Sequence, residues 1–99
     1  MIIEKTKIFD KWLRALRDNN ALFRINIRIE RLENGNMGDV KSVGEGVLEL
    51  RINYGPGYRI YFTQKEELIM LLLCGGNKKT QLKDIEMAKE IKKCLLKKI

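Results

Sequence analysis

The sequence predicts an α+β fold in which helices precede an antiparallel sheet and a further helix follows it. In residues 8–33, apolar side chains recur every three or four positions, which is the period of an amphipathic helix. In residues 47–74, strand-like runs follow one another at hairpin spacing. Helical periodicity returns from residue 80. The chain has 99 residues, so we expect one domain spanning residues 1–99.

The first half is expected to hold a short strand and two helices. Met1–Glu4 suits an edge strand, and Thr6 is a candidate N-cap for the helix that follows. Polar residues 18–20 interrupt the pattern and can cap a second helix over Ala21–Glu33. Two helices joined by a short polar turn predict a helical hairpin.

The second predicted helix carries an arginine stripe, formed by Arg24, Arg28 and Arg31 at spacings of four and three. This stripe could contact a polyanion or an acidic partner. It could equally be a solvated surface, because Glu30 and Glu33 lie close in sequence.

The sheet is expected to have about four strands, counting the short one at the N-terminus. Its antiparallel part comprises Val47–Tyr54, Tyr58–Gln64 and the wholly apolar Leu68–Cys74, which suits a central position. Residues 37–46 are expected to form a loop, and Lys41 within it is a candidate RNA-binding residue. Gly-Pro-Gly at 55–57 and Gly-Gly at 75–76 have the composition of turns and lack the spacing of a phosphate-binding loop.

The last helix is predicted over Thr80–Lys98. We expect one face to be buried and lysines to fill the other faces, including Lys97 and Lys98. The expected buried face comprises Leu82, Ile85, Ala88 (or Lys89), Ile91 and Leu95.

Composition narrows the possible functions. The net charge is +7, which favours nucleic acid or another polyanion as partner. No apolar run is long enough to span a bilayer and the N-terminus does not resemble a secretory signal, so we expect a cytoplasmic protein without membrane contact. The chain lacks histidine, and its two cysteines, Cys74 and Cys94, are expected to be buried; we therefore expect neither a metal site nor a cofactor.

The predicted strands bring cations together. Strand alternation places Glu49 and Arg51 on one face of the first long strand, and Arg59 and Tyr61 on one face of the next. We expect this face to be open. Lys78 and Lys79 follow the third strand and can lie at its rim.

Such a surface suits RNA. Arginines can stabilise charge on a scissile phosphate, and Tyr61 could stack on a base. Glu49 could accept the proton of the RNA 2′-hydroxyl, so that cleavage would need no metal. Alternatively, Glu49 forms a cross-strand ion pair with Arg51 or Arg59, worth less than about 1 kcal/mol.

Several segments resemble the RelE/ParE toxin superfamily, and most of all its HigB-like "addiction module killer protein" branch. The resemblance extends over nearly the whole chain and follows the same order of elements. The matching segments are Phe-Asp-Lys-Trp-Leu at 9–13, Arg-Ile-Glu-Arg-Leu at 28–32, Gly-Asn-Met-Gly-Asp at 35–39, Gly-Val-Leu-Glu-Leu-Arg-Ile at 46–52, Gly-Pro-Gly-Tyr-Arg-Ile-Tyr-Phe at 55–62 and Leu-Leu-Cys-Gly-Gly-Asn-Lys-Lys-Thr-Gln at 72–81.

The resemblance implies a RelE-like fold and a type II toxin that cleaves mRNA on the ribosome as an endoribonuclease. It also implies a cognate helix-turn-helix antitoxin of the HigA type. It assigns the site to Arg59 and Arg51, and less directly to Lys78 and Lys79. Many members have a catalytic tyrosine or histidine in or near the last helix, whereas this chain has neither after Tyr61.

Two other functions remain open. The chain could be a ParE-like toxin that poisons DNA gyrase without cutting RNA, or a non-catalytic basic binding module. An RNase needs Arg51 and Arg59 exposed and convergent, whereas gyrase poisoning would tolerate their loss.

Overall fold

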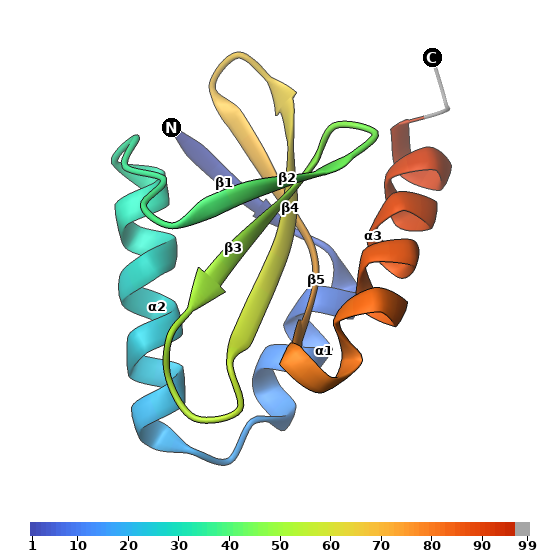
Figure 1. Ribbon diagram of the computed structural model, residues 1–99. Helices are drawn as coiled ribbons and strands as arrows, with labels where there is room; N and C mark the ends of the chain where they lie inside the picture. Colours follow the sequence, from blue (N-terminus) through green and yellow to red (C-terminus); the bar gives the residue numbers. More distant parts are fainter. Residues whose placement is uncertain (97–99) are drawn as a thin grey trace.

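The computed structural model describes residues 1–96, which form one five-stranded sheet with helices on both faces (Figure 1). The strands lie in the order β1-β5-β4-β3-β2. Their bounds are Ile2–Lys5 for β1, Val40–Gly44 for β2, Val47–Ile52 for β3, Tyr58–Glu66 for β4 and Ile69–Asn77 for β5. The helices are α1 (Lys7–Ala15), α2 (Asn19–Glu33), the 3₁₀ turn η1 (Lys78–Thr80) and α3 (Gln81–Leu96).

The α+β class and the order of elements are confirmed, and both helix starts have the predicted caps. The Thr6 hydroxyl accepts a hydrogen bond from the Phe9 amide at 3.0 Å. The Asp18 carboxylate accepts from the amides of Asn20 and Ala21. These caps satisfy amide groups that have no partner within the helix, which is why α1 and α2 begin where they do.

The sheet differs from the prediction in two ways. The segment 37–46 is not only a loop, because it contains β2, which pairs antiparallel with β3. Glu45 and Gly46 join the two strands with φ of 54° and 76°, and positive φ at both positions is typical of a tight hairpin turn. The sheet is also mixed, since β1 pairs parallel with β5.

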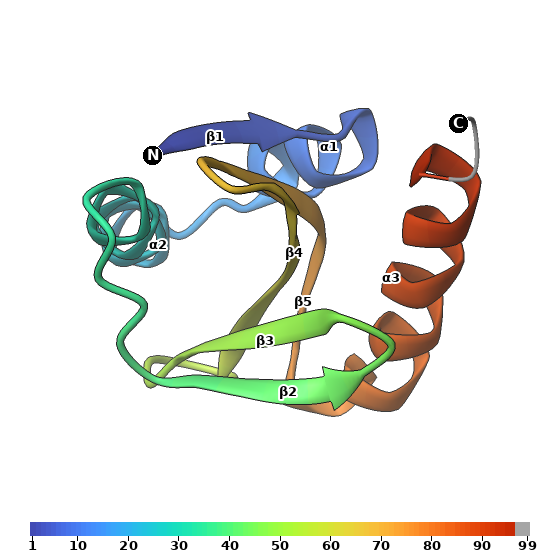
Figure 2. The same cartoon turned by 90° about the horizontal axis from the view of Figure 1, so that it is seen from above.

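Two hydrophobic cores lie on opposite faces of the sheet. Figure 2 shows α1 and α2 on one side of β4 and β5, with α3 on the other side. The larger core joins α1 and α2 to the sheet through Phe9, Ile25, Leu32, Leu50 and Phe62, among others. The smaller core lies beneath α3 and comprises Val47, Tyr61, Leu71, Leu73, Cys74 and Ala88.

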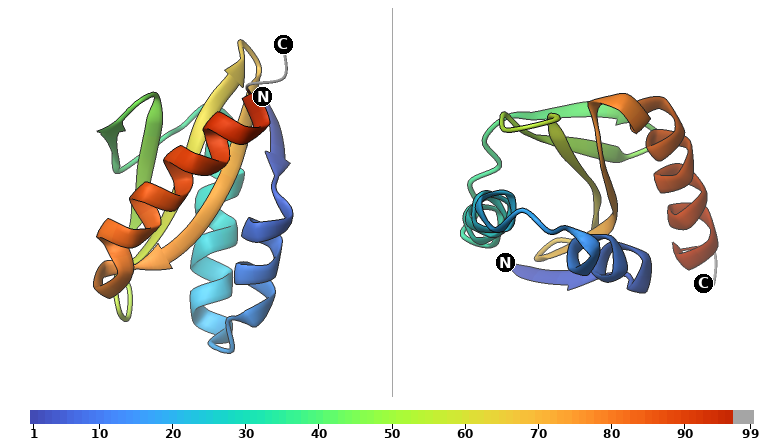
Figure 3. Two further views of the ribbon diagram at one scale, coloured as in Figure 1. Left: turned by 90° about the vertical axis from the view of Figure 1, so that its right-hand side faces the viewer. Right: turned by 90° about the horizontal axis from the view of Figure 1, so that it is seen from below.

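The helix α3 lies along β4 and β5 on one face of the sheet, as the left view of Figure 3 shows, and fewer of its apolar side chains are buried than predicted. Ala88 is buried, whereas Leu82 is 82% exposed and Leu95 is 50% exposed. Cys74 is buried as expected, but the same expectation for Cys94 is wrong because its side chain is exposed. The predicted positions Lys97 and Lys98 lie outside the described residues. Within residues 1–96, no helix is long and apolar enough to cross a membrane.

The strand β5 does not end at Gly75 and Gly76, as predicted, but runs through both of them. Neither glycine adopts a positive φ. Each is needed for space, because a Cβ at Gly75 would overlap the Trp12 ring from α1, and one at Gly76 would overlap the Asp84 carboxylate from α3. The glycine pair therefore lets helices approach the same strand from both faces.

Candidate functional site

The face that carries Arg51 and Arg59 is only partly open. We expected Glu49 and Tyr61 to lie on an uncovered surface, and that expectation is wrong: both side chains are fully buried. The N-terminal part of α3 covers them, since Gln81 contacts Glu49 directly. The strand period correctly placed the four residues on one face, but α3 leaves open only the end with the two arginines, where the Arg51 side chain is 40% exposed and that of Arg59, expected to be exposed, is only 11% exposed.

The buried carboxylate of Glu49 holds the base of this site together. Its Oε2 atom accepts hydrogen bonds from the Tyr61 hydroxyl at 2.9 Å and from the Gln81 amide at 2.8 Å. The Arg59 Nε atom lies 3.6 Å from the same oxygen, close enough for an ion pair. The ion pair considered as an alternative role of Glu49 is thus present with Arg59, diagonally across the two strands.

Tyr61 is a hydrogen-bond donor inside the protein. Burial raises the pKa of its hydroxyl far above the usual range, and the hydrogen bond to Glu49 raises the pKa further. The phenol therefore stays protonated at physiological pH. In this arrangement the ring is covered by protein on all sides and is not available for stacking on a base.

Arg51 and Arg59 face each other directly on β3 and β4. Like charges at opposed positions destabilise a sheet, so each guanidinium needs a counter-charge or a ligand. Arg59 has Glu49, and its Nη1 also donates to the Gly57 carbonyl at 2.6 Å. Arg51 has Asp39, whose Oδ1 lies 3.2 Å from its Nη2 in a more exposed ion pair.

A hollow of about 290 Å³ opens where the two arginines meet. The Nε atoms of both arginines are buried and have no hydrogen-bond partner among residues 1–96, although that of Arg59 lies 3.6 Å from Glu49 Oε2. A buried donor without a partner costs about 1–3 kcal/mol, and an anion in the hollow would reduce that cost. The hollow is lined by Asp39, Arg51, Ile52, Asn53, Gly57, Arg59 and Lys78.

The predicted lysines separate in the structure. Lys78 joins the two arginines around the hollow. Lys79 lies next to it in η1 and lines a neighbouring hollow instead. Lys41 lies on β2, directly opposite Glu49, where its side chain is exposed at the edge of the sheet and outside the lining of the arginine hollow.

Sequence reasoning missed two residues that shape the site. Asp39 supplies the carboxylate that lines the hollow, and Gln81 fixes Glu49 from α3. Asp39 lies in the segment Gly-Asn-Met-Gly-Asp, directly before β2. Because β2 was not predicted, nothing in the sequence indicated that Asp39 would lie beside Arg51. Gln81 could not be found from local patterns, because its contact with β3 spans 32 residues of sequence.

The fold and the site together define a small basic α+β protein with an arginine-lined hollow at the open end of its sheet. Residues 11–93 match the model of the phage-derived Gp49-like proteins, and the chain belongs to this family. The chain is also similar to an uncharacterised Haemophilus influenzae protein, with 51% identity over 87 residues and an alignment that covers 88% of each chain.

Proposed function

We propose that this protein is the toxin of a type II toxin–antitoxin system and that it cleaves mRNA on the ribosome. The observation that carries the proposal is the direct opposition of Arg51 and Arg59 around a hollow that Lys78 also lines, with a buried Nε atom on each arginine that makes no hydrogen bond within residues 1–96. Planar guanidinium groups match the geometry of a phosphate and keep their charge at any physiological pH. The net charge of +7 favours the approach of RNA.

The proposed reaction is attack of an RNA 2′-hydroxyl on the adjacent phosphorus. The new bond closes a 2′,3′-cyclic phosphate while the bond to the 5′-oxygen breaks, and negative charge builds up on the phosphate oxygens. Arg51, Arg59 and Lys78 would stabilise that charge, an effect worth about 10²–10³ in rate for one well-placed donor. Asp39 is the carboxylate within this hollow and is placed to accept the 2′-hydroxyl proton, and Lys78 can donate a proton to the 5′-oxygen as it leaves.

We assign Glu49 a positioning role in place of the role of proton acceptor. Its carboxylate is fully buried and accepts hydrogen bonds from Tyr61 and Gln81. It therefore fixes the Arg59 side chain, which is only 11% exposed, with its guanidinium at the hollow.

The proposal includes a protein antitoxin of the helix-turn-helix type, as the resemblance implies. A groove of about 630 Å³ between α1 and α3 is consistent with a protein partner. Ile8, Met87 and Leu95 contribute exposed apolar surface to it. Exposed apolar patches of this kind are typical of interaction surfaces.

The test is induced expression in growing cells, with the 5′ ends of cellular mRNA mapped before and after induction. The wild-type chain should arrest growth and produce cuts at ribosomal A-site codons, and co-expression of the neighbouring reading frame should relieve the arrest. Arg59→Lys keeps the charge but loses the planar fork, so we expect cutting to fall about 100-fold. Arg14→Ala, which removes an exposed cation on α1, should leave cutting unchanged.

The removal of Arg59 altogether needs a compensated variant, because it would leave Glu49 buried without a counter-charge. The pair Arg59→Met/Glu49→Gln removes both charges and should fold but not cut. Full cutting by this folded variant would refute the proposed site. Growth arrest without cuts in mRNA would favour gyrase poisoning, and an absence of arrest would favour a binding module.

A further inference from the structure

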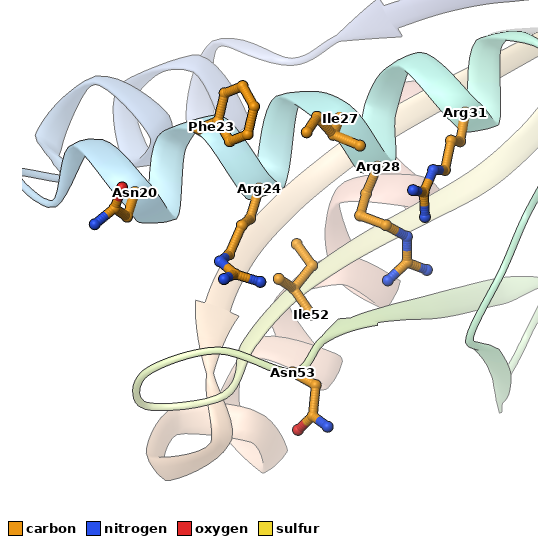
Figure 4. Close-up of a pocket in the computed structure, with 8 residues that line it drawn as sticks. All are labelled: Asn20, Phe23, Arg24, Ile27, Arg28, Arg31, Ile52 and Asn53. Atoms are coloured by element: carbon orange, nitrogen blue, oxygen red, sulfur yellow. The ribbon is translucent and has the colours of Figure 1, made fainter.

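A second cationic groove runs along α2, beside the arginine hollow. It has a volume of about 480 Å³. Figure 4 shows Arg24, Arg28 and Arg31 leaving the same side of α2 and pointing toward the end of β3. The groove, named here the α2 groove, is lined by Asn20, Phe23, Arg24, Ile27, Arg28, Arg31, Ile52 and Asn53.

The three arginines of this groove are not neutralised by nearby carboxylates. Among the described residues, none of them forms an ion pair within 4.0 Å, although Glu30 and Glu33 lie on the same helix. Arg28 is partly buried, and this burial lowers the pKa of its guanidinium; the charge of Arg31 lowers it further, while Asp39 opposes both effects. A row of like charges that forms no ion pair among the described residues favours an anionic ligand.

The α2 groove adjoins the proposed catalytic hollow. Ile52 and Asn53 line both of them. Arg28 also ties the two together, because its Nη1 donates to the main-chain carbonyl of Arg51 at 2.6 Å. A ligand that fills the hollow at Arg51 could therefore extend along α2 without leaving the protein surface.

The remaining groups of the groove suit a single-stranded nucleic acid. Arg24 and Arg31 are seven residues apart, which corresponds to about 10 Å along a helix, or roughly three stacked nucleotides. Phe23 is 66% exposed beside them, and aromatic rings on a basic groove bind unpaired bases by stacking. Arg24 also lies over the Tyr54 ring, 4.7 Å from its centre, which holds its guanidinium at the end of the groove.

We infer that the α2 groove binds the RNA strand next to the cleaved phosphate, with Arg24 and Arg31 on the backbone and Phe23 against a base. This inference rests on the proposed function, because the strand that enters the groove is the one placed at Arg51 and Arg59. An acidic protein segment would use the same cations, but it would not need a groove that adjoins the hollow or an exposed ring at this spacing.

The test uses the purified full chain and fluorescent RNA oligonucleotides that are 2′-O-methylated throughout, so that they cannot be cleaved by their own 2′-hydroxyls. A short oligonucleotide fills only the hollow, whereas a long one reaches α2. We expect Arg24→Ala/Arg31→Ala to weaken binding of the long oligonucleotide on the order of tenfold at low salt. The slope of log K against log salt should fall by about 1.4, which is two phosphate contacts on a single strand. Binding of the short oligonucleotide should not change.

The matched control is Lys11→Ala/Arg14→Ala, which removes two exposed cations from α1 and should change neither affinity nor slope. Phe23→Ala should weaken the binding of the long oligonucleotide only, with no change in the slope of log K against log salt. The inference would be overturned if the Arg24→Ala/Arg31→Ala variant kept the wild-type salt slope, or if it lost equal affinity for the short and the long oligonucleotide. Polyglutamate serves as an acidic-peptide probe. The inference would also be overturned if the variant bound polyglutamate more weakly than the wild type but bound RNA equally well. Because binding is measured without cleavage, a chain that binds in this way but cuts no mRNA would refute the catalytic proposal and leave the groove standing.

Discussion

Arg59 lies between a buried carboxylate and an open hollow. Its side chain is 11% exposed, and Glu49 beneath it is completely shielded from water. A buried ion pair adds little net stability, because desolvation of both charges offsets their attraction. The removal of only one of the two charges is costly, since the remaining charge is then buried without a partner. Glu49 thus fixes the position of Arg59 and supplies the counter-charge that a buried guanidinium needs.

At this scale we predict the effect of two substitutions at Glu49. Glu49→Ala should lower the free energy of unfolding by about 3–5 kcal/mol, because it leaves Arg59 without a counter-charge and opens a cavity. Glu49→Gln also removes the counter-charge of Arg59, but it keeps the side-chain volume and an acceptor for the Tyr61 hydroxyl, so its cost should be smaller than that of Ala by about 1–2 kcal/mol. Urea denaturation of the wild type and both variants measures the difference. Equal losses for Ala and Gln would show that the lost charge, which the two variants share, accounts for the whole effect, and that the cavity and the hydrogen bond to Tyr61 add nothing.

Among the elements, β5 has the most demanding packing. It is an interior strand, paired with β1 and β4, and α1 and α3 approach it from opposite faces. The pairing of β5 with β4 shifts register beside Leu73, and such an irregularity bends a strand. After the shift Cys74 faces α3. Gly75 then faces α1, and Gly76 faces α3. The close approach at Gly76 brings Asp84 and Thr80 against the strand and sets where α3 begins relative to Arg59, which pairs with Gly76.

We therefore predict that Gly75→Ala destabilises the fold by overpacking, by about 1–3 kcal/mol. The added methyl group meets the Trp12 ring, which also packs edge-on against Tyr58. Trp12→Leu frees the space, so the double variant should lose less stability than the sum of the single changes. Thermal unfolding of the four proteins gives this coupling. Strict additivity would show that the ring is not what excludes a side chain at Gly75.

For the whole molecule, the buried thiol and phenol beneath α3 link stability to alkaline pH. Burial raises the pKa of the Cys74 thiol from 9.0 to about 12, and the nearby Asp84 carboxylate adds to the shift. Tyr61 is shifted in the same direction. Both groups ionise more readily in the unfolded chain. Each group contributes its full stability below its pKa in the unfolded chain, which is 9.0 for the thiol and 10.0 for the phenol. This contribution is lost as the pH rises from that value toward the pKa of the group in the folded protein.

We predict that the urea midpoint is level from pH 7 to about 8.5 and falls above that pH. In Cys74→Ala the overall midpoint should be lower because of the small cavity, but the fall should begin about one pH unit later, where Tyr61 ionises in the unfolded state. Midpoints measured at half-unit steps from pH 7 to about 10.5 test this. An identical profile in both proteins would mean that Cys74 does not titrate on unfolding.

Much of the fold was predictable because its signals are local. Caps at Thr6 and Asp18 and the helical period marked α1 and α2 correctly. The strand β2 was missed because its residues 40–44 alternate poorly and its pairing partner determines it. The pairing of β1 with β5 was missed for a related reason. Ile2 and Ile69 are far apart in sequence, and a strand of four residues carries no pattern that specifies which strand it pairs with.

The sequence by itself determined the class of fold and the side of the sheet on which each strand residue lies, because alternation with a period of two is a property of the backbone. It therefore placed Arg51 and Arg59 together. Only the tertiary structure decided which part of that face is covered, since the path of α3 depends on distant contacts such as Gly76 with Asp84 and Gln81 with Glu49. Alternation specifies a face but not what packs against it, and this is why Glu49 and Tyr61 became interior supports while Arg51 and Arg59 reached the hollow.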